Sequence, residues 1–368
     1  MREEWSFKTF GDIMSPARVI RCSERKLPVL SITMRNGIVE QNERFNKSIA
    51  SKDRSNYKVV KNGQLVIAFP IDEGLIYTQD IVSEGIMSPA YNVWDVNYNL
   101  VDRRFLVAYF HSSYAFTYYK AKLKGTTQRR RSMDKSDLLS MPIPVPPLAE
   151  QERIVDELDL LSSIIEKKKA QLKELDQLAQ SIFYDMFGDP ITNEKGWKVK
   201  KLKEVCENCD SMRKPITAKD RIQGLIPYYG ASGVVDYVKD YIFDGEYLLI
   251  SEDGANLLAR STPIAFSIKG KTWVNNHAHV LKFANKIVQQ YVEFSINLRD
   301  ISSIVTGCAQ PKLTQANLNK IAIAYPPLPL QQEFASKIEA IERQKSLIQQ
   351  SIVETQTLFD SRMEHWFN

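Results

Sequence analysis

The sequence repeats itself at a fixed offset, and this repeat constrains the fold more than any other feature. Pro146-Pro147-Leu148 returns 180 residues later as Pro326-Pro327-Leu328, and the offset holds without a gap to the C-terminus. Gln151 matches Gln331 in this alignment. An internal repeat of this length predicts two copies of one structural unit, related by a pseudo-two-fold axis.

The globular parts that precede the two Pro-Pro pairs also correspond. Gly125-Thr126-Thr127-Gln128 resembles Gly307-Cys308-Ala309-Gln310, and Trp5 begins the first block as Trp197 begins the second. The repeated unit is therefore a globular module followed by a shorter segment of roughly 40 residues. The predicted boundaries are 1–145 and 191–325 for the two modules, and 146–190 and 326–368 for the two segments that follow them.

Both shorter segments are predicted to be long helices. Apolar residues recur at steps of four and three from Ile154 to Met186 and from Phe334 to Trp366, interrupted by Lys168 and Lys345. This is the a/d pattern of a coiled coil, and at ~1.5 Å per residue each helix would be about 55–60 Å long. The two helices are expected to pair antiparallel within the chain; the alternative is that each packs on its own module.

The modules have the pattern of mixed α/β (α+β) domains with many short strands. Strands are predicted at 65–69, 247–251 and 280–283, and a helix at 289–298. The predicted fold class is thus two mixed α/β domains joined by two long helices that form an antiparallel intramolecular coiled coil. The two modules share little sequence between their edges, which is typical of one scaffold adapted to two different ligands.

Charge alternates along the chain. The net charges are +8 for residues 1–135, −6 for 136–190, +5 for 191–320 and −2 for 321–368. Two basic blocks indicate two surfaces for a polyanion, and the acidic helices between them indicate a different role. No apolar run reaches the ~18 residues of a membrane span and no signal sequence is evident, so a cytoplasmic protein with reduced cysteines is expected.

The motifs of common catalytic sites are missing from this sequence. It has no Walker-type phosphate loop, no dinucleotide fingerprint, and no Asn/Asp-Pro-Pro-Tyr/Phe tetrapeptide of the amino-methyltransferases. A single Cys-x-x-Cys, Cys206 to Cys209, is a weak zinc signal, and two buried thiols are favoured. His277 and His279 would need further ligands to hold a metal. We therefore expect no catalytic residue, metal or bound cofactor in this chain.

The basic residues at the end of the first module favour nucleic-acid binding. Clustered cations repel one another unless an anion is present, and the arginine fork suits phosphate or a guanine edge. A solvated charged face is the alternative reading, but the basic character recurs in the second module. The candidate DNA-binding residues of the first module are Lys120, Lys122, Lys124, Gln128, Arg129, Arg130 and Arg131.

The second module offers polar groups that could read base edges. A flexible loop is expected at 228–233, with amides close by at 275–277, and both could equally be ordinary turns over the core. A third segment, Gln310-Pro311-Lys312, occupies the place in the second repeat that the arginine run occupies in the first. The candidate residues are Tyr229, Gly230, Ser232, Gly233, Asn275, Asn276, His277, Gln310 and Lys312.

Taken together, these motifs resemble the specificity subunit of type I restriction–modification enzymes over the whole length. The strongest elements are residues 141–152 running into the first helix and their echo at 321–332, followed by 228–233 and 275–280. One departure is Arg129-Arg130-Arg131-Ser132, where the family more often has a step like Pro311-Lys312-Leu313.

The resemblance implies two target-recognition domains, each reading one half of a split site in double-stranded DNA. It implies that two methyltransferase subunits dock on the helices, near Gln151, Glu152, Gln331 and Gln332, and that restriction subunits with an ATP-dependent translocase join them. S-adenosylmethionine would be bound by the methyltransferase partners. Two alternatives are a coiled-coil adaptor of another phage-defence or DNA-associated complex, and an enzyme that uses Cys206 and Cys209.

Overall fold

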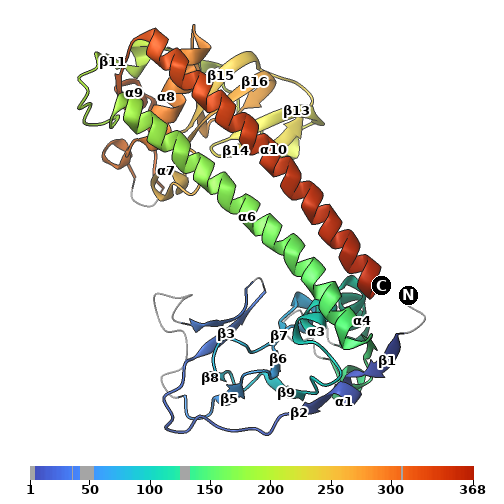
Figure 1. The fold of residues 1–368 in the computed structure, drawn as a ribbon. Helices are drawn as coiled ribbons and strands as arrows, with labels where there is room; N and C mark the ends of the chain where they lie inside the picture. The colour runs from blue at the N-terminus through green and yellow to red at the C-terminus, as the bar shows by residue number, and fades with distance from the viewer. Residues whose placement is uncertain (1–4, 35, 42–53, 125–132, 308–309) are drawn as a thin grey trace. The chain divides into compact units, whose positions relative to one another are not determined.

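The computed structural model describes residues 5–34, 36–41, 54–124, 133–307 and 310–368. The chain forms two compact units, Met1–Lys168 with Gln350–Asn368, and Lys169–Gln349. The predicted long helices are confirmed as α6 (Leu148–Phe187) and α10 (Leu328–Phe367), and each contributes to both units (Figure 1). Among the described helices, none has a stretch apolar enough to cross a membrane.

The same frame surrounds the start of the long helix in both units. In the first unit β1 (Ser6–Thr9) pairs antiparallel with β10 (Pro142–Val145). In the second unit β11 (Val199–Lys201) pairs in the same way with β18 (Ala322–Ala324). The backbone N–H of Phe10 donates to Met141 over 2.8 Å, and Leu202 donates to Ile321 over 2.9 Å. The sequence repeat therefore corresponds to a repeated piece of backbone structure.

The rest of the first unit consists of short helices and small sheets. One four-stranded sheet has the order β2-β9-β6-β7, and β3-β4 and β5-β8 form two-stranded sheets. The strands are β2 (Met14–Pro16), β3 (Leu30–Thr33), β4 (Gly37–Glu40), β5 (Lys58–Lys61), β6 (Leu65–Ile67), β7 (Ile76–Thr78), β8 (Glu84–Met87) and β9 (Asn92–Val96). The helices are α1 (Phe10–Ile13), α3 (Arg103–Phe110), α4 (Ser113–Lys122) and α5 (Lys135–Leu139).

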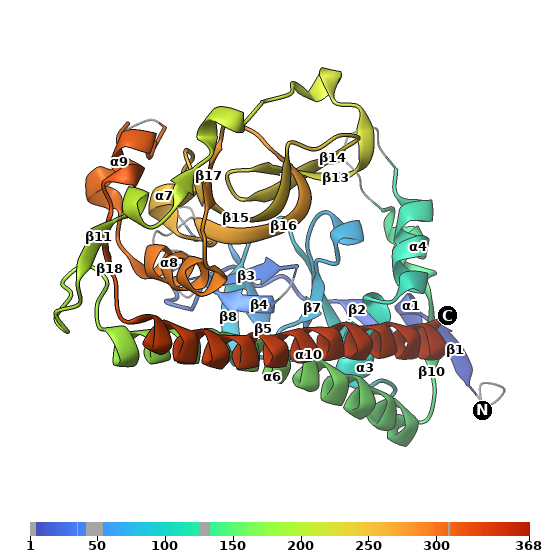
Figure 2. The same ribbon diagram turned by 90° about the horizontal axis from the view of Figure 1, so that it is seen from above.

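The second unit is built on one larger sheet. Its six strands have the order β12-β17-β15-β16-β13-β14, and helix α8 packs on β16 (Figure 2). The strands are β12 (Glu207–Asn208), β13 (Gln223–Gly230), β14 (Gly233–Val238), β15 (Phe243–Ser251), β16 (Ala265–Val274) and β17 (Ala278–Lys282). The helices are α7 (Asn256–Ala259), α8 (Lys286–Leu298) and α9 (Gln315–Asn319). The predicted strands and the predicted helix of this module are confirmed.

The two long helices pair antiparallel, and they also pack on the modules. In the first unit the start of α6 and the end of α10 share one core, which contains Ile154, Leu158 and Trp366. In the second unit the end of α6 and the start of α10 share another, which contains Phe183 and Phe334. Both arrangements considered from the sequence are therefore present, because each helix has apolar residues enough for a partner helix and a module.

The two lysines that interrupt the heptad pattern link the helices. In the first unit Lys168 on α6 donates to the hydroxyls of Ser351 and Thr355 on α10, over 2.7 and 2.8 Å. In the second unit Lys345 on α10 pairs with Asp176 on α6 over 2.8 Å. Polar groups at such positions are known to fix the register of a coiled coil.

Candidate nucleic-acid interface

The three segments singled out in the second module meet at the C-terminal end of β15. The N–H of Asn275 donates to Tyr229 over 3.0 Å, and the N–H of Glu252, just after β15, donates to His277 over 2.9 Å. The N–H of Gly254 donates to Pro311 over 3.0 Å. Residues 229–233, 275–277 and 310–312 therefore lie side by side although the sequence separates them.

The expected flexible loop at 228–233 is a tight hairpin instead. Tyr228 to Gly230 belong to β13 and Gly233 begins β14, so only Ala231 and Ser232 form the turn. Gly233 has φ +123°, a backbone conformation that residues with a side chain rarely adopt. Of the two readings left open for this segment, the ordinary turn is the one present, because the pairing of β13 with β14 and β16 continues almost to its tip.

The candidate residues of this cluster divide into exposed and buried ones. Gly230 and Asn275 are buried, and the Asn275 side chain accepts the N–H of His277 over 2.8 Å. Gly230 closes the hairpin and the Asn275 side chain holds the turn at 275–277, so both have a structural role, and their DNA-binding role stays a prediction. Tyr229 is half-buried. The exposed members are Ser232, Asn276, His277, Gln310 and Lys312.

A buried network of charged side chains lies beneath these exposed groups. Arg213 donates to Glu252 over 2.6 Å, and the Nδ1 of His279 lies 2.6 Å from Asp210. The Nε2 of His279 lies 2.8 Å from the carbonyl oxygen of Leu313. Because Leu313 follows Lys312, the network holds the 310–313 segment against the end of β15. Asp210, His279 and Glu252 were not recognised as candidates from the sequence, where they lie far apart.

The carboxylates of this network are kept charged by their partners. Burial by itself would raise the pKa of Glu252, but the hydrogen bond from Arg213 and the nearby His279 bring that pKa below its usual value. Burial likewise opposes ionisation of Asp210, and the hydrogen bond with His279 nevertheless lowers its pKa. Asp210, Glu252 and His279 have the residue types of a metal site, but Arg213 and the two acceptors around His279 already occupy their ligand atoms.

Two exposed cationic candidates of the cluster are also paired. Lys312 lies 3.1 Å from Glu252, and the Nδ1 of His277 lies 2.9 Å from Asp253. Beside the cluster, β14 is the edge strand of the sheet and carries exposed apolar side chains, Val235 at 57% and Tyr237 at 52% exposure. A projecting two-stranded ribbon of this kind fits the major groove, where apolar side chains can contact thymine methyl groups.

In the first module, two of the predicted cations have acidic partners. Lys122 pairs with Asp137 over 3.1 Å, and Lys124 pairs with Asp134. Lys120 is exposed on α4. Gln128, Arg129, Arg130 and Arg131 lie outside the described residues, so their DNA-binding role stays a prediction.

The doubled glutamine has a structural role in both units. Gln151 is fully buried and donates to the carbonyl oxygens of Pro146 and Leu100 over 2.8 and 2.9 Å. Gln331 is fully buried as well and donates to Pro326 over 2.8 Å. These side chains fix the start of each long helix and are unavailable to a partner, which corrects their predicted docking role. Glu152 and Gln332 are exposed and stay candidates.

The surroundings of Cys206 and Cys209, the residues considered for a redox or zinc enzyme, disfavour the thiolate form. Burial raises the pKa of Cys206 to about 12, and its Sγ donates to the carbonyl oxygen of Leu202 over 3.2 Å. Burial also raises the pKa of Cys209. Since the thiolate is the form that attacks substrates and binds zinc, these surroundings favour a structural role.

Comparison with protein families identifies the chain. The family model of the type I restriction modification DNA specificity domain matches residues 2–177 and 194–356, one match for each repeat. The chain therefore belongs to this family. The two matches follow the repeat found in the sequence and cover both modules with most of both long helices.

Individual relatives agree with this assignment. A putative type I restriction enzyme specificity subunit of Haemophilus influenzae is 36% identical over 149 residues, 40% of this chain and 38% of that relative's own length. A putative type I specificity subunit of Mycoplasma pneumoniae is 27% identical over 215 residues, 56% of this chain and 85% of the relative.

Solved structures share the fold at low sequence identity. A chain from a study of assembly and conformational transition of the type I restriction–modification system matches with a TM-score of 0.64 at 16% identity, covering 99% of this chain and 97% of that one. The type I specificity subunit of M. genitalium matches with a TM-score of 0.53 at 14% identity, covering 99% and 96%. These likenesses confirm the predicted fold class.

Proposed function

We propose that this chain is the DNA-recognition subunit of a type I restriction–modification complex, in which each module reads one half of a split duplex sequence. The observation that carries the proposal is the gathering of exposed polar groups from three distant segments at the end of β15, in the second of two modules that share one frame. Phosphate contacts would supply most of the affinity, and a few base contacts worth ~1–3 kcal/mol each would supply the discrimination.

The long helices would serve as spacer and as docking platform for two methyltransferase subunits. Residues 136–190 have a net charge of −6, so this helix is repelled by DNA phosphates and is suited to a protein partner. Since Gln151 and Gln331 are buried, the exposed neighbours Glu152 and Gln332 are the positions that could contact such a partner.

The chemistry would belong to the partners. Methyl transfer would take place on the methyltransferase subunits, which would bind S-adenosylmethionine, and cleavage would need restriction subunits with an ATP-dependent translocase. This chain would bind no cofactor and would catalyse no step. Its place would be the cytoplasm of a bacterium or archaeon, where the duplex DNA is.

Methylome sequencing tests the recognition role. Cells that carry the chain with its methyltransferase subunits should show one split methylated motif that disappears when the gene for this chain is removed. Changing Ser232 and Asn276 together to Ala should relax one half of the motif and leave the other half intact, since both are exposed in one module. A motif that persists without the chain would contradict the proposal.

A helix insertion tests the spacer role separately. One heptad inserted into both α6 and α10 lengthens each helix by about 10 Å, which corresponds to about three base pairs at ~3.4 Å each. The gap between the two methylated half-sites should therefore grow by about three base pairs. An unchanged gap would show that the helices do not set the spacing, while recognition itself could still stand.

A further inference from the structure

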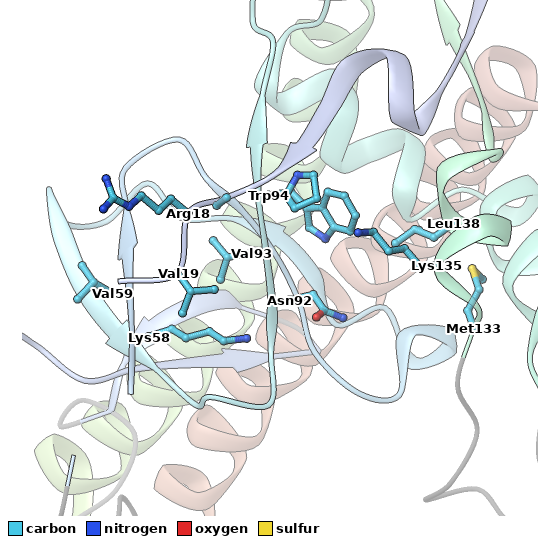
Figure 3. Close-up of a pocket in the computed structure, with 12 residues that line it drawn as sticks. Arg18, Val19, Lys58, Val59, Asn92, Val93, Trp94, Met133, Lys135 and Leu138 are labelled. Carbon is cyan, nitrogen blue, oxygen red and sulfur yellow. The ribbon is translucent and has the colours of Figure 1, made fainter. Parts of the chain in front are cut away.

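A cavity of about 260 Å³ opens between β2, β5, β9 and α5 in the first module. Figure 3 shows the residues that line it. Lys58 extends its amine from β5, Lys135 extends its amine from α5 toward Trp94, and the guanidinium of Arg18 points away from Trp94. The remaining walls are largely apolar and include Val19 and Met133.

The charge of this cavity is unbalanced. The described residues that line it include the three cations Arg18, Lys58 and Lys135 and no carboxylate. Among the residues that the structure describes, none of the three forms an ion pair. Lys122 and Lys124 differ, because each has an aspartate partner. A set of cations around an open pocket, without a carboxylate among the described residues that line it, is an arrangement that an anion would stabilise.

Lys58 is the cation most firmly built into this cavity. Its ammonium group donates to the carbonyl oxygen of Tyr91 over 2.5 Å, which fixes its position and leaves two hydrogens for a ligand. Burial, together with the nearby charge of Arg21, lowers the pKa of Lys58, so a bound anion would relieve an existing electrostatic penalty. Lys135 lies 6.0 Å from the ring centre of Trp94.

We propose that this cavity binds one sugar–phosphate unit of a nucleotide, with the phosphate between Lys58 and Lys135 and the sugar against the apolar wall. The volume suits a ligand larger than an isolated phosphate, and the apolar residues beside the cations match the carbon face of a sugar. The backbone of bound duplex DNA and a free nucleotide both carry this group. Binding of this group as part of duplex DNA rests on the proposed function, whereas binding of a free nucleotide does not.

The test compares two double variants of the full chain with equal charge change. Lys58→Gln with Lys135→Gln removes the two cavity amines. Lys26→Gln with Lys61→Gln is the control, since both lysines are exposed and neither lines the cavity; Lys61 ends the same strand, β5, that Lys58 begins. Duplex affinity would be measured across salt concentrations, and binding of dAMP and of inorganic phosphate by calorimetry.

If DNA is the source, the cavity variant should bind duplex about three- to tenfold more weakly near 100 mM salt, with a salt slope about 1 smaller and an unchanged motif. If a free nucleotide is the source, dAMP should bind the unaltered chain and the control, but not the cavity variant. The proposal is overturned if the two double variants match in both assays. A chain that binds no duplex would refute the proposed function, and the dAMP assay would still decide about the cavity.

Discussion

The two units share a frame, but the cations beside the candidate interface of the second unit and those around the cavity of the first differ in their partners. In the second unit the cations near the candidate interface are neutralised from below, Arg213 by Glu252 at 2.6 Å and Lys312 by the same carboxylate at 3.1 Å. In the first unit Lys58 and Lys135 line a cavity for which the described part of the chain supplies no carboxylate. Near the second unit's candidate interface the charges hold chain segments together, whereas the three cations around the first unit's cavity form no ion pair among the described residues.

This difference separates what the repeat requires from what it leaves free. The paired strands β1–β10 and β11–β18 and the buried glutamine after each Pro-Pro pair occur in both units. The sheets between these edges differ in size and order. This frame of paired strands and buried glutamine thus positions the start of each long helix in the same way in both units. The interior of the module between its edges can differ from one unit to the other.

Breaking the buried network should give the largest effect and should be confined to the second unit. The Arg213 side chain is only 12% exposed and pairs with both Glu252 and Asp210. Arg213→Met removes this buried cation from both carboxylates, so the free energy of unfolding should fall by about 3–5 kcal/mol. Chemical denaturation would measure this loss, and hydrogen exchange should rise at 252–254 and 310–313.

The matched control is Arg104→Met in the first unit. Arg104 pairs with Asp156 and Asp159 at 2.8 and 3.0 Å, but its side chain is 44% exposed. Exposed pairs contribute at most about 1 kcal/mol, so this variant should unfold almost as the unaltered chain does. Equal losses for the two variants would show that burial does not distinguish the two units.

The glutamine anchors should differ although the repeat makes them equivalent. Gln151 donates two hydrogen bonds and accepts a third from the N–H of Asp102 over 2.7 Å. Gln331 donates to Pro326, and its Oε1 is buried without a partner among the described residues. Gln151→Leu should therefore cost about 2–3 kcal/mol and Gln331→Leu less than about 1. Urea midpoints would rank the two, and the reverse order would refute this account.

The sequence predicted the fold better than it predicted the interface. The predicted segments 146–190 and 326–368 match both helices to within three residues, because a long apolar period and the Pro-Pro pairs are local signals. The repeat placed the frame. The repeat singled out Gln151 and Gln331 as important positions, but docking was predicted where both side chains are buried. A repeated polar residue does not show whether it faces a partner or the core.

The interface was harder because its parts meet only after folding. Asp210, Glu252 and His279 come together through the order β12-β17-β15, which no local pattern encodes. Lys122 and Lys124 stood out as part of a run, yet Asp137 in α5 and Asp134 just before it supply an aspartate for each. The cations of the cavity are isolated in the sequence, so composition gave no reason to group them.

A smaller effect is expected from the basic runs at the corresponding ends of the two modules. Changing Arg129, Arg130 and Arg131 together to Ala should lower the salt slope of duplex binding by up to about 2.7, at ~0.9 for each phosphate contact. Lys312→Ala should lower it by less than about 1, because Glu252 already neutralises that amine. Anisotropy titrations between 50 and 200 mM salt cover the range, and an unchanged slope for the triple variant would remove the arginines from the interface.

The smallest effect should be a different response of the two units to acid. The pKa of Asp210 and that of Glu252 lie below their usual values despite burial, because His279 and Arg213 stabilise the charged forms. A lowered pKa in the folded state adds stability above the usual carboxyl pKa of about 4, and this contribution is lost as the pH falls below it. Burial raises the pKa of both carboxylates while their partners lower it, so the net gain in stability is modest.

The urea midpoint of the second unit should therefore fall between pH 5 and pH 3, and Glu252→Gln should flatten that fall while lowering the midpoint at neutral pH. In the first unit the pKa of Glu157 is lowered by its hydrogen bond with Arg362, but the carboxylate is 31% exposed. Solvent screening weakens that pair, so Glu157→Gln should change the acid response less. A larger change for Glu157→Gln would reverse the comparison, because the acid response of the first unit would then depend on a partly exposed ion pair more than that of the second unit depends on its buried network.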